Sequence, residues 1–297
     1  MTGPAEAGDG PVAGVIGTPI AHSLSPVIHG YWLEMAGLPG RYVKREIPVE
    51  SFAADFRRLL TIEGWVGMNV TVPHKEAAFA ACDRLDDAAR RLGAVNTVIR
   101  HEDGVIEGRN TDLYGFRASL EASPDWPQVR TGTAFVLGAG GAARAVVAAL
   151  QDVGFADIQI VNRNPARAEA LARDLMDGTW GGLSARARDG LEQSLGDCDL
   201  LVNTTSLGME GQPPLDIDLR RLPETTLVAD IVYRPLETGL LATARARGNP
   251  VVDGLGMLLH QAVPGFQAWF KPPVAPTVDA ELRRRVLDAA GIEDTAR

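Results

Sequence analysis

A glycine-rich turn, VLGAGGAARA at residues 136–145, limits the possible folds of this chain more than any other segment. It follows an apolar run typical of a buried strand and opens an alanine-rich segment typical of a helix. Gly138, Gly140 and Ala143 fill the G-x-G-x-x-G/A fingerprint, which gives a tight turn and lets the backbone approach a pyrophosphate. The free N–H groups at the start of the helix attract that anion. A glycine-rich turn without a ligand is the alternative, but the strand–helix–strand context favours a dinucleotide site.

The residues after the next expected strand indicate which dinucleotide is bound. An NAD site needs an acid about 20 residues beyond the glycines to hold a ribose hydroxyl, and no acid stands between Asn162 and Arg167. Arg163 and Arg167 can instead clamp a 2′-phosphate by charge-assisted hydrogen bonds; two solvated arginines at a helix start are the plain alternative. We therefore expect NADP (NADPH), with these contacts from the glycine turn and the second strand: Gly138, Ala139, Gly140, Gly141, Ala142, Asn162, Arg163, Asn164 and Arg167.

The alternation of apolar runs with amphipathic segments predicts an α/β fold with two domains. The length of 297 residues is about twice the ~150 of a typical domain. In the first half, strands expected at 12–17, 41–49 and 65–72 alternate with helices at 26–37, 49–60 and 75–85, so the sheet should be mostly parallel. The second half shows a doubly wound, Rossmann-like pattern, with strands at 133–137, 157–162, 199–205, 226–233 and 251–254 and helices at 140–154, 165–175 and 240–248.

The same pattern sets the expected domain boundaries. Residues 1–10 are small, polar and rich in glycine and proline, and we expect a disordered tail there. After residue 254 the pattern is helical with no new strand, so this part should fold back on the first domain. We therefore expect a discontinuous substrate-binding domain at 11–111 and 254–297, and an NADP-binding domain at 112–253.

Composition and charge exclude several classes of function. The net charge of −9 leaves no basic excess to neutralise the phosphates of a nucleic acid. No run approaches the ~18 apolar residues of a membrane span. The two cysteines, Cys82 and Cys198, lack metal-ligand spacing and do not form a disulfide framework, so we expect no metal site and a cytoplasmic location.

Three polar clusters lie at expected strand ends in the first half, where open α/β sheets bind their ligands. They are GTPIAHSLSP at 17–26, NVTVPHK at 69–75, and GAVNT at 93–97 with GRNTD at 108–112. Each has a structural alternative when taken alone. Ser25 and Pro26 can start a helix, Asn96 can brace a loop, and Asp112 can cap the helix that follows it.

Taken together, these clusters and the glycine turn resemble the shikimate dehydrogenase family closely. The resemblance runs in the family's order from about Gly14 to Gln261. It implies an enzyme that uses NADPH to reduce 3-dehydroshikimate to shikimate in the biosynthesis of aromatic amino acids through chorismate. The matching stretches are HSLSP, NVTVPHK, GAVNT, GRNTDLYG, GAGGAARA, NRNPAR, NTTSLGM, DIVYRPLET and GLGMLLHQA.

The resemblance also implies roles for individual residues. Lys75 and Asp112 match the family's catalytic pair, and such a pair suits carbonyl reduction, because an ammonium can supply the proton that the alkoxide needs while the carboxylate orients it. Ser23, Ser25 and Tyr233 match residues that hold the substrate carboxylate. The neutral donors and acceptors expected on the ring hydroxyls are Thr71, Asn96 and Gln261.

Other positions are less specific. Ile231, Gly254 and Asp87 fall near the cofactor in relatives, although apolar packing, a turn and a solvated helix face explain them as well. Gly30 stands where the family commonly has asparagine, and we assign it no role. Asn164 replaces the threonine or serine that often follows the first arginine. We interpret His74, beside Lys75, as structural.

Two further functions remain open from the sequence. One is a quinate/shikimate dehydrogenase with a broader substrate range or with use of NAD. The other is a catalytically silent NADP-binding module, whose mark would be the loss of Lys75 or Asp112. The resemblance implies a monomer or a homodimer that takes only small-molecule ligands.

Overall fold

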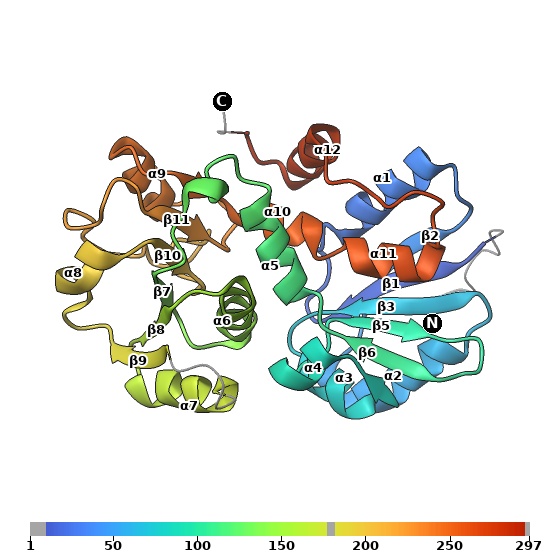
Figure 1. Cartoon of the computed structure of the whole chain (residues 1–297). Helices are drawn as coiled ribbons and strands as arrows, with labels where there is room; N and C mark the ends of the chain where they lie inside the picture. Colours follow the sequence, from blue (N-terminus) through green and yellow to red (C-terminus); the bar gives the residue numbers. More distant parts are fainter. Residues whose placement is uncertain (1–9, 177–181, 295–297) are drawn as a thin grey trace. The chain divides into compact units, whose positions relative to one another are not determined.

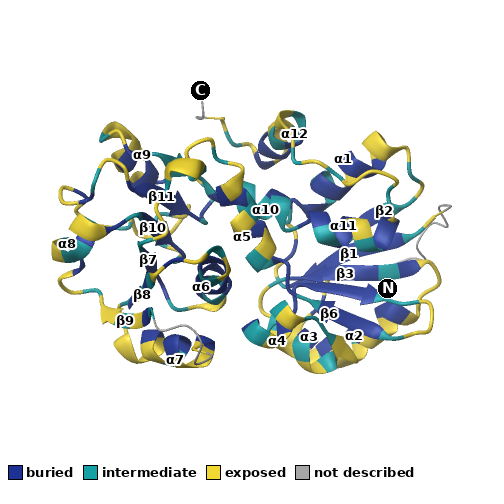
Figure 2. Ribbon diagram, in the orientation of Figure 1, coloured by how far each residue is buried: buried dark blue, intermediate teal, exposed yellow. Residues whose placement is uncertain are grey.

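The computed structural model describes residues 10–176 and 182–294 and divides the chain into two units (Figure 1). Unit 1 comprises Met1–Thr111 and Ala262–Ala290, and unit 2 comprises Asp112–Gln261 and Gly291–Arg297. Apart from Gly10, the tail expected at 1–10 lies outside the described residues. Each unit has its own six-stranded sheet, and most strand residues are buried (Figure 2).

The sheet of unit 1 is mixed, with the strand order β2-β1-β3-β5-β6-β4. The strands β2, β1 and β3 are parallel, whereas β5 runs antiparallel to both β3 and β6. The bounds are β1 (Val12–Gly17), β2 (Arg41–Glu46), β3 (Trp65–Val70), β4 (Arg84–Leu85), β5 (Thr97–Arg100) and β6 (Ile106–Arg109).

The β5–β6 hairpin is a part of this sheet that the expected β-α-β-α-β order does not contain. Its turn is closed by hydrogen bonds from the His101 N–H to the Val105 carbonyl (2.9 Å) and from the Gly104 N–H to the His101 carbonyl (3.0 Å). The two strands are short, and polar motifs flank them, so no long apolar run marks them. The hairpin makes the sheet less parallel than expected, and it brings residues on both sides of it to one edge of the sheet.

The helices of unit 1 follow the apolar periodicity of the sequence. Helix α2 buries Phe52, Phe56, Leu59 and Leu60, the face expected from their spacing. The C-terminal helices α11 and α12 belong to this unit, and the Trp269 indole of α11 donates to the Val98 carbonyl of β5 (2.9 Å). The bounds are α1 (Ser25–Ala36), α2 (Phe52–Thr61), α3 (Lys75–Ala81), α4 (Asp87–Leu92), α11 (Val263–Phe270) and α12 (Ala280–Ala290).

The sheet of unit 2 is parallel throughout, with the order β12-β11-β10-β7-β8-β9 of a Rossmann-like doubly wound domain. Helix α6 is rich in alanine and valine and is largely buried (Figure 2). The strands are β7 (Thr133–Leu137), β8 (Asp157–Asn162), β9 (Leu183–Ala187), β10 (Leu200–Asn203), β11 (Leu227–Asp230) and β12 (Val251–Val252). The helices are α5 (Asp112–Glu121), α6 (Gly141–Val153), α7 (Pro165–Leu175), α8 (Leu191–Ser194), α9 (Gly239–Ala246) and α10 (Gly254–His260).

Helices α5 and α10 pack closely in unit 2 because glycines face larger neighbours. A Cβ on Gly115 would lie 2.6 Å from the Cβ and 2.8 Å from the backbone nitrogen of Gln261. A Cβ on Gly256 would collide with the Ser119 hydroxyl. This contact keeps α10 in unit 2, so the chain returns to unit 1 after residue 261, later than the expected boundary at 254. Among the described helices, none combines the length and the apolar character that a membrane crossing requires.

Candidate active site

Several predicted residues of unit 1 gather at one edge of its sheet. Thr71 directly follows β3, and Lys75 opens α3. Asn96 directly precedes β5, and because β5 runs antiparallel to β3, the start of β5 lies at the edge where β3 ends. The Val70 N–H donates to the Asn96 carbonyl (2.8 Å), and the Val95 N–H donates to the Lys75 carbonyl (2.9 Å). The hairpin therefore brings Asn96 beside the segment that carries Thr71 and Lys75.

The two predicted serines stand at the start of α1. The Ser23 hydroxyl lies 3.3 Å from that of Ser25, and the Ser25 N–H donates to the Ser23 oxygen (3.4 Å). Ser25 is buried and is the first residue of a 12-residue helix. The hydroxyls, together with the positive end of the helix dipole, suit a carboxylate without adding a buried full charge.

A buried hydrogen-bond network supports this edge from behind. The Tyr42 hydroxyl donates to Asn69 Oδ1 (2.6 Å), and Asn69 Nδ2 donates to Thr97 Oγ1 (3.1 Å). Thr97 Oγ1 in turn donates to Asn96 Oδ1 (3.0 Å), which also accepts from the Thr111 N–H (2.8 Å). The Asn96 amide is therefore held in one orientation. Sequence reasoning missed Tyr42, Thr97 and Thr111, although Thr97 and Thr111 lie inside quoted motifs.

His74 has the structural role that we expected. Its ring is buried, stacks on Phe52 (4.7 Å between centroids) and donates from Nε2 to the Ile47 carbonyl (2.6 Å). The neighbouring Lys75 is half-buried and is the first residue of α3.

The predicted catalytic pair is divided between the two units. Lys75 belongs to unit 1, whereas Asp112 is the first residue of α5 in unit 2. Asp112 directly follows Thr111, which is fixed to Asn96 by the hydrogen bond described above. Gln261 also belongs to unit 2, where its backbone packs on Gly115 and its Nε2 donates to the Leu258 carbonyl (3.0 Å).

The glycine turn of unit 2 has the geometry of a dinucleotide cradle. Gly138 has a φ of 114°, in the region that favours glycine, and a Cβ there would lie 2.6 Å from Thr204 Oγ1. At Gly140 and Gly141 a Cβ would meet nothing within 4 Å, so space is open above the first turn of α6. A pyrophosphate fits this open space against the N–H groups of the helix start.

The end of β8 fits a phosphate at the ribose. Arg163 and Arg167 are exposed, and within the described parts of the chain neither guanidinium forms an ion pair or a side-chain hydrogen bond. Asn164 Oδ1 accepts from the Ala166 N–H (3.1 Å) and caps α7, which leaves its amide nitrogen for a ligand. Asn162 Nδ2 donates to the Asn164 carbonyl (2.9 Å) and holds this turn in shape.

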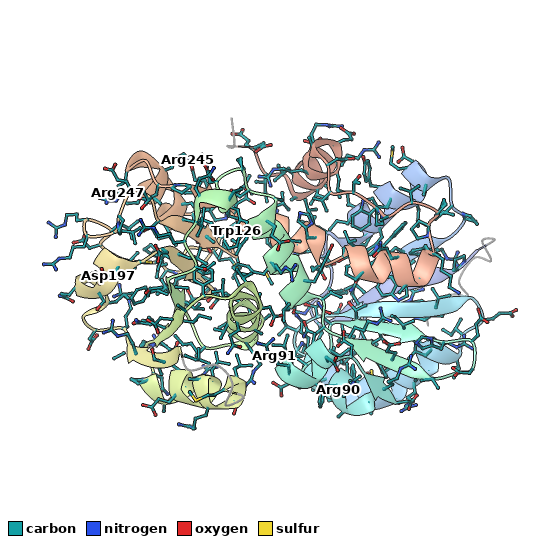
Figure 3. All side chains as sticks on the ribbon, viewed as in Figure 1. Arg90, Arg91, Trp126, Asp197, Arg245 and Arg247 are labelled. Atoms are coloured by element: carbon teal, nitrogen blue, oxygen red, sulfur yellow. The ribbon has the colours of Figure 1, made fainter. Side chains whose placement is uncertain are left out.

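Packing or solvent surrounds the three less specific positions, and Tyr233 lies two residues from one of them in the chain. Gly254 is buried, and a Cβ there would collide with the Ile231 carbonyl, so the two residues are packed backbone to backbone in unit 2. Tyr233 is half-buried, and burial raises the pKa of its phenol. Asp87 lies in unit 1 with a fully exposed side chain and pairs with Arg90 (3.2 Å), which Figure 3 labels.

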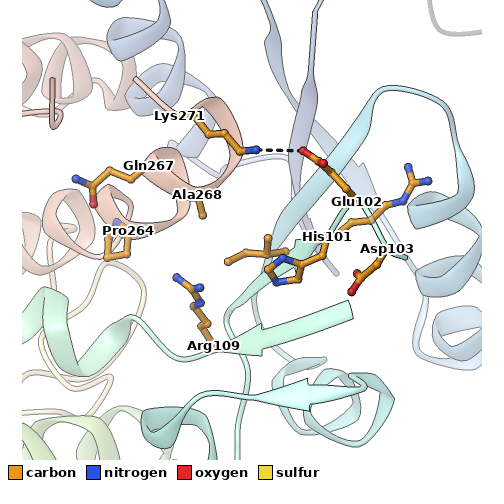
Figure 4. Close-up of a pocket in the computed structure, with 10 residues that line it drawn as sticks. His101, Glu102, Asp103, Arg109, Pro264, Gln267, Ala268 and Lys271 are labelled. Atoms are coloured by element: carbon orange, nitrogen blue, oxygen red, sulfur yellow. Dashed lines mark ion pairs between the residues drawn. The ribbon is translucent and has the colours of Figure 1, made fainter. Parts of the chain in front are cut away.

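A cavity of about 680 Å³ lies elsewhere in unit 1, between the β5–β6 hairpin and α11 (Figure 4). His101, Arg109 and Gln267 line it, and Lys271 forms an ion pair with Glu102 at a distance of 3.6 Å. None of the predicted site residues lines this cavity.

Comparison with known proteins gives consistent relatives for both units. Residues 15–98 match the model of the shikimate dehydrogenase substrate binding domain, and residues 121–208 match the shikimate/quinate 5-dehydrogenase model. A curated shikimate dehydrogenase (NADP(+)) of Methylobacterium radiotolerans is 56% identical over 284 residues, which cover 95% of this chain and 98% of the relative.

Solved structures resemble the whole chain. Shikimate 5-dehydrogenase from Thermus thermophilus, in complex with NADP(H) and shikimate, is 37% identical with a TM-score of 0.79, over 95% of this chain and 98% of that one. Quinate dehydrogenase from Corynebacterium glutamicum, in complex with NAD, is 30% identical with a TM-score of 0.84, over 94% of this chain and 99% of that one.

Proposed function

This chain belongs to the shikimate dehydrogenase family, and from that membership we propose that it is an NADP-dependent oxidoreductase that reversibly reduces 3-dehydroshikimate to shikimate. The substrate assignment rests mainly on the polar residues at the sheet edge of unit 1. There, neutral hydroxyls and amides stand beside Lys75. A polyhydroxylated ring with one carboxylate needs this combination of neutral donors and acceptors.

In the proposed mechanism, Lys75 handles the proton. NADPH, when bound, supplies the hydride to the carbonyl carbon. The Lys75 ammonium gives its proton to the oxygen as negative charge develops there, and in the oxidative direction the neutral amine takes the hydroxyl proton. Asp112 orients the lysine and accepts a hydrogen bond from the adjacent hydroxyl.

Substrate positioning falls to the remaining polar residues. We assign the carboxylate to Ser23, Ser25 and Tyr233, because two hydroxyls at a helix start and a phenol provide donors without a second buried cation. Ring hydroxyls are assigned to Thr71, Asn96 and Gln261. The fixed orientation of Asn96 supports its part in this assignment, since a pre-oriented amide loses little entropy on binding.

The cofactor assignment is supported by the charge at the end of β8. The exposed Arg163 and Arg167 attract a 2′-phosphate, and no carboxylate between Asn162 and Arg167 repels it. Asn162 and Asn164 shape the same turn. The glycine turn, with Ala139 and Ala142, holds the pyrophosphate. We keep Ile231, Gly254 and Asp87 as weaker cofactor assignments, since packing or solvation accounts for each of them.

A matrix of initial rates tests the proposed function. Shikimate and quinate are each offered with NADP⁺ and with NAD⁺, and reduction is followed by nicotinamide absorbance. Fast turnover with shikimate and NADP⁺ alone is the expected result. Comparable rates with quinate or NAD⁺ would move the chain to the activity of the quinate dehydrogenase relative. Absence of turnover in folded protein that binds NADP⁺ would contradict enzymatic function.

We also propose a cytoplasmic monomer or homodimer. Both cysteines are free thiols in the structure, and free thiols suit a reducing compartment. Light scattering of the purified protein at micromolar concentration would distinguish these states from a larger assembly.

A further inference from the structure

A buried carboxylate in unit 2 has no role in the mechanism above. Asp230 ends β11 and is 2% exposed. Its Oδ1 accepts from the Val232 N–H (3.0 Å) and from Asn203 Nδ2 (3.0 Å), and its Oδ2 accepts from the Thr238 hydroxyl (2.7 Å). These donors come from separate segments of the chain, so one side chain joins the end of β10, the segment after β11 and the start of α9.

Through its hydrogen bond from Asn203, Asp230 supports the turn after β10, and this turn contacts the glycine turn. Asn203 Oδ1 accepts from the N–H (3.0 Å) and the hydroxyl (2.7 Å) of Thr205, and its Nδ2 also donates to the Leu207 carbonyl (3.2 Å). Thr204, inside the turn formed in this way, donates its N–H (2.8 Å) and its hydroxyl (2.7 Å) to the Leu137 carbonyl. The Thr204 hydroxyl fills the space where Gly138 would carry a Cβ.

Asp230 also fixes the segment after β11, which carries two proposed ligand contacts. It accepts a hydrogen bond from the N–H of Val232, and Val232 lies between these two contacts, Ile231 and Tyr233. The backbone of Ile231 is packed against Gly254 at the start of α10. Thr238, the third donor, also accepts from the Leu241 N–H (3.4 Å) and so caps α9. Asp230 therefore connects the cradle proposed for the pyrophosphate with the segment that carries Ile231, a weaker cofactor assignment, and Tyr233, assigned to the substrate carboxylate.

We propose that Asp230 is a positioning residue for NADP: through Asn203 and the Val232 N–H it holds the glycine turn and the 231–233 segment in the arrangement that binds the cofactor. This inference rests on the proposed function only for the identity of the ligand.

The electrostatics of Asp230 supply a signature that simple packing would not. Burial raises the pKa of Asp230 to about 6, against the lowering effect of the hydrogen bonds from Val232, Thr238 and Asn203. Among the described residues, the groups that face this carboxylate are neutral. Above pH 6 the ionised carboxylate accepts from all of these donors. Below pH 6 one oxygen carries a proton, and its hold on the donors weakens.

The test measures NADP⁺ binding by titration calorimetry on the full chain, without turnover. Asp230→Asn should raise the Kd for NADP⁺ about tenfold at pH 8, because an amide nitrogen replaces one accepting oxygen. Asp199→Asn is the matched control: Asp199 accepts from the Thr133 N–H (2.9 Å) at the opposite end of β10, and its substitution should leave the Kd unchanged. Thermal unfolding of each variant reports whether it is folded.

The pH dependence separates positioning from general stability. The ratio of the Kd of Asp230→Asn to that of the unaltered chain should fall from about ten at pH 8 towards one at pH 5, because a protonated aspartate and an asparagine are alike in this site. Protonation of the cofactor's own phosphate cancels in this ratio. An equal Kd at pH 8, or a ratio that stays constant with pH, would overturn the inference.

A second pair of variants keeps the inference testable if Asp230→Asn does not fold. Thr238→Val removes the hydroxyl and should raise the Kd for NADP⁺ several-fold, whereas Thr238→Ser keeps it and should restore binding. Equal Kd values for the two would count against the inference. If the unaltered chain does not bind NADP⁺ at all, the proposed function fails first, and this outcome is distinct from the others.

Discussion

At the scale of the residue, Lys75 is the side chain on which the proposed reaction depends most. Lys75→Ala should lower kcat by about 10²–10⁴-fold while the KM for shikimate changes little, because the lost group acts on the proton in the transition state. Steady-state rates with shikimate and NADP⁺ measure both constants. Lys271→Ala is the control, since Lys271 lines the separate cavity of unit 1 and should leave kcat unchanged. An unaltered kcat in Lys75→Ala would remove the residue from the mechanism.

The arginines after β8 carry a second residue-scale prediction. The double variant Arg163→Ala/Arg167→Ala should raise the KM for NADP⁺ by about tenfold or more and change that for NAD⁺ by less than about threefold, because only NADP⁺ has the 2′-phosphate. Arg173→Ala, at an exposed arginine on α7, the helix that also carries Arg167, should affect neither value. Equal effects of the double variant on both cofactors would contradict the phosphate clamp.

At the scale of the element, the contact between α5 and α10 should be sensitive to added volume. Gly115→Ala places a methyl group 2.6–2.9 Å from side-chain and backbone atoms of Gln261, so the helices must move apart. We expect a loss of about 1–3 kcal/mol in the free energy of unfolding and a higher KM for shikimate, because α5 begins with Asp112. Gly239→Ala on α9, where a Cβ meets nothing within 4 Å, should be neutral in denaturant unfolding. A fully stable Gly115→Ala would show that the contact is loose.

The elements also show what the sequence can predict. Strands such as β1, β3, β7 and β8 are predictable because apolar runs mark them. The sequence does not predict strand β9, because Leu183 is the one buried residue of this edge strand. It does not predict the β5–β6 hairpin either, because polar motifs flank the two short strands. A strand at the edge of a sheet needs few apolar residues, so the periodic signal is weak there.

For the candidate site, the sequence predicts which motifs carry polar groups but not how those groups are held. The Tyr42 to Asn69 bond and the Asn203 to Asp230 bond each join residues 27 positions apart. No local spacing encodes such pairs, because the order of the strands in each sheet decides which residues meet. The position of Asn96 depends in the same way on the antiparallel direction of β5.

At the scale of the whole molecule, acid stability should depend on Glu107. Burial opposes ionisation of Glu107, but hydrogen bonds from Arg109, Arg84 and His101 outweigh it and lower the pKa to about 2. The fold therefore gains from ionisation: this stabilisation is present above pH 4.5, the ordinary value, and is lost as the pH falls towards 2. Solvent around the half-exposed arginine partners screens these interactions, so the contribution of Glu107 to the free energy of unfolding is about 2–3 kcal/mol at pH 7.

Glu107→Gln should accordingly lower the Tm of the chain at pH 7, lower it by less at pH 3, and have little effect near pH 2, where much of the folded-state carboxyl is protonated. Calorimetric unfolding across this range measures the difference between the two proteins. Glu121→Gln is the control, because its ion pair with Arg117 is solvent-exposed and should not shift the acid transition. A destabilisation of Glu107→Gln that does not vary with pH would assign the residue a role in packing only.

The division of the chain also has a consequence for its synthesis. Unit 1 is closed by α11 and α12, and the Trp269 indole of α11 reaches a carbonyl 171 positions earlier in the chain. All described secondary structure of unit 2 is in place by residue 261. We expect chains held on the ribosome by a linker that places residue 262 outside the exit tunnel to show protease resistance in unit 2 but not in unit 1; early resistance in unit 1 would disprove this. Most of unit 1 is therefore synthesised before unit 2 but completes its fold after it. Until α11 and α12 are added, the apolar core of unit 1 stays partly exposed and available to chaperones.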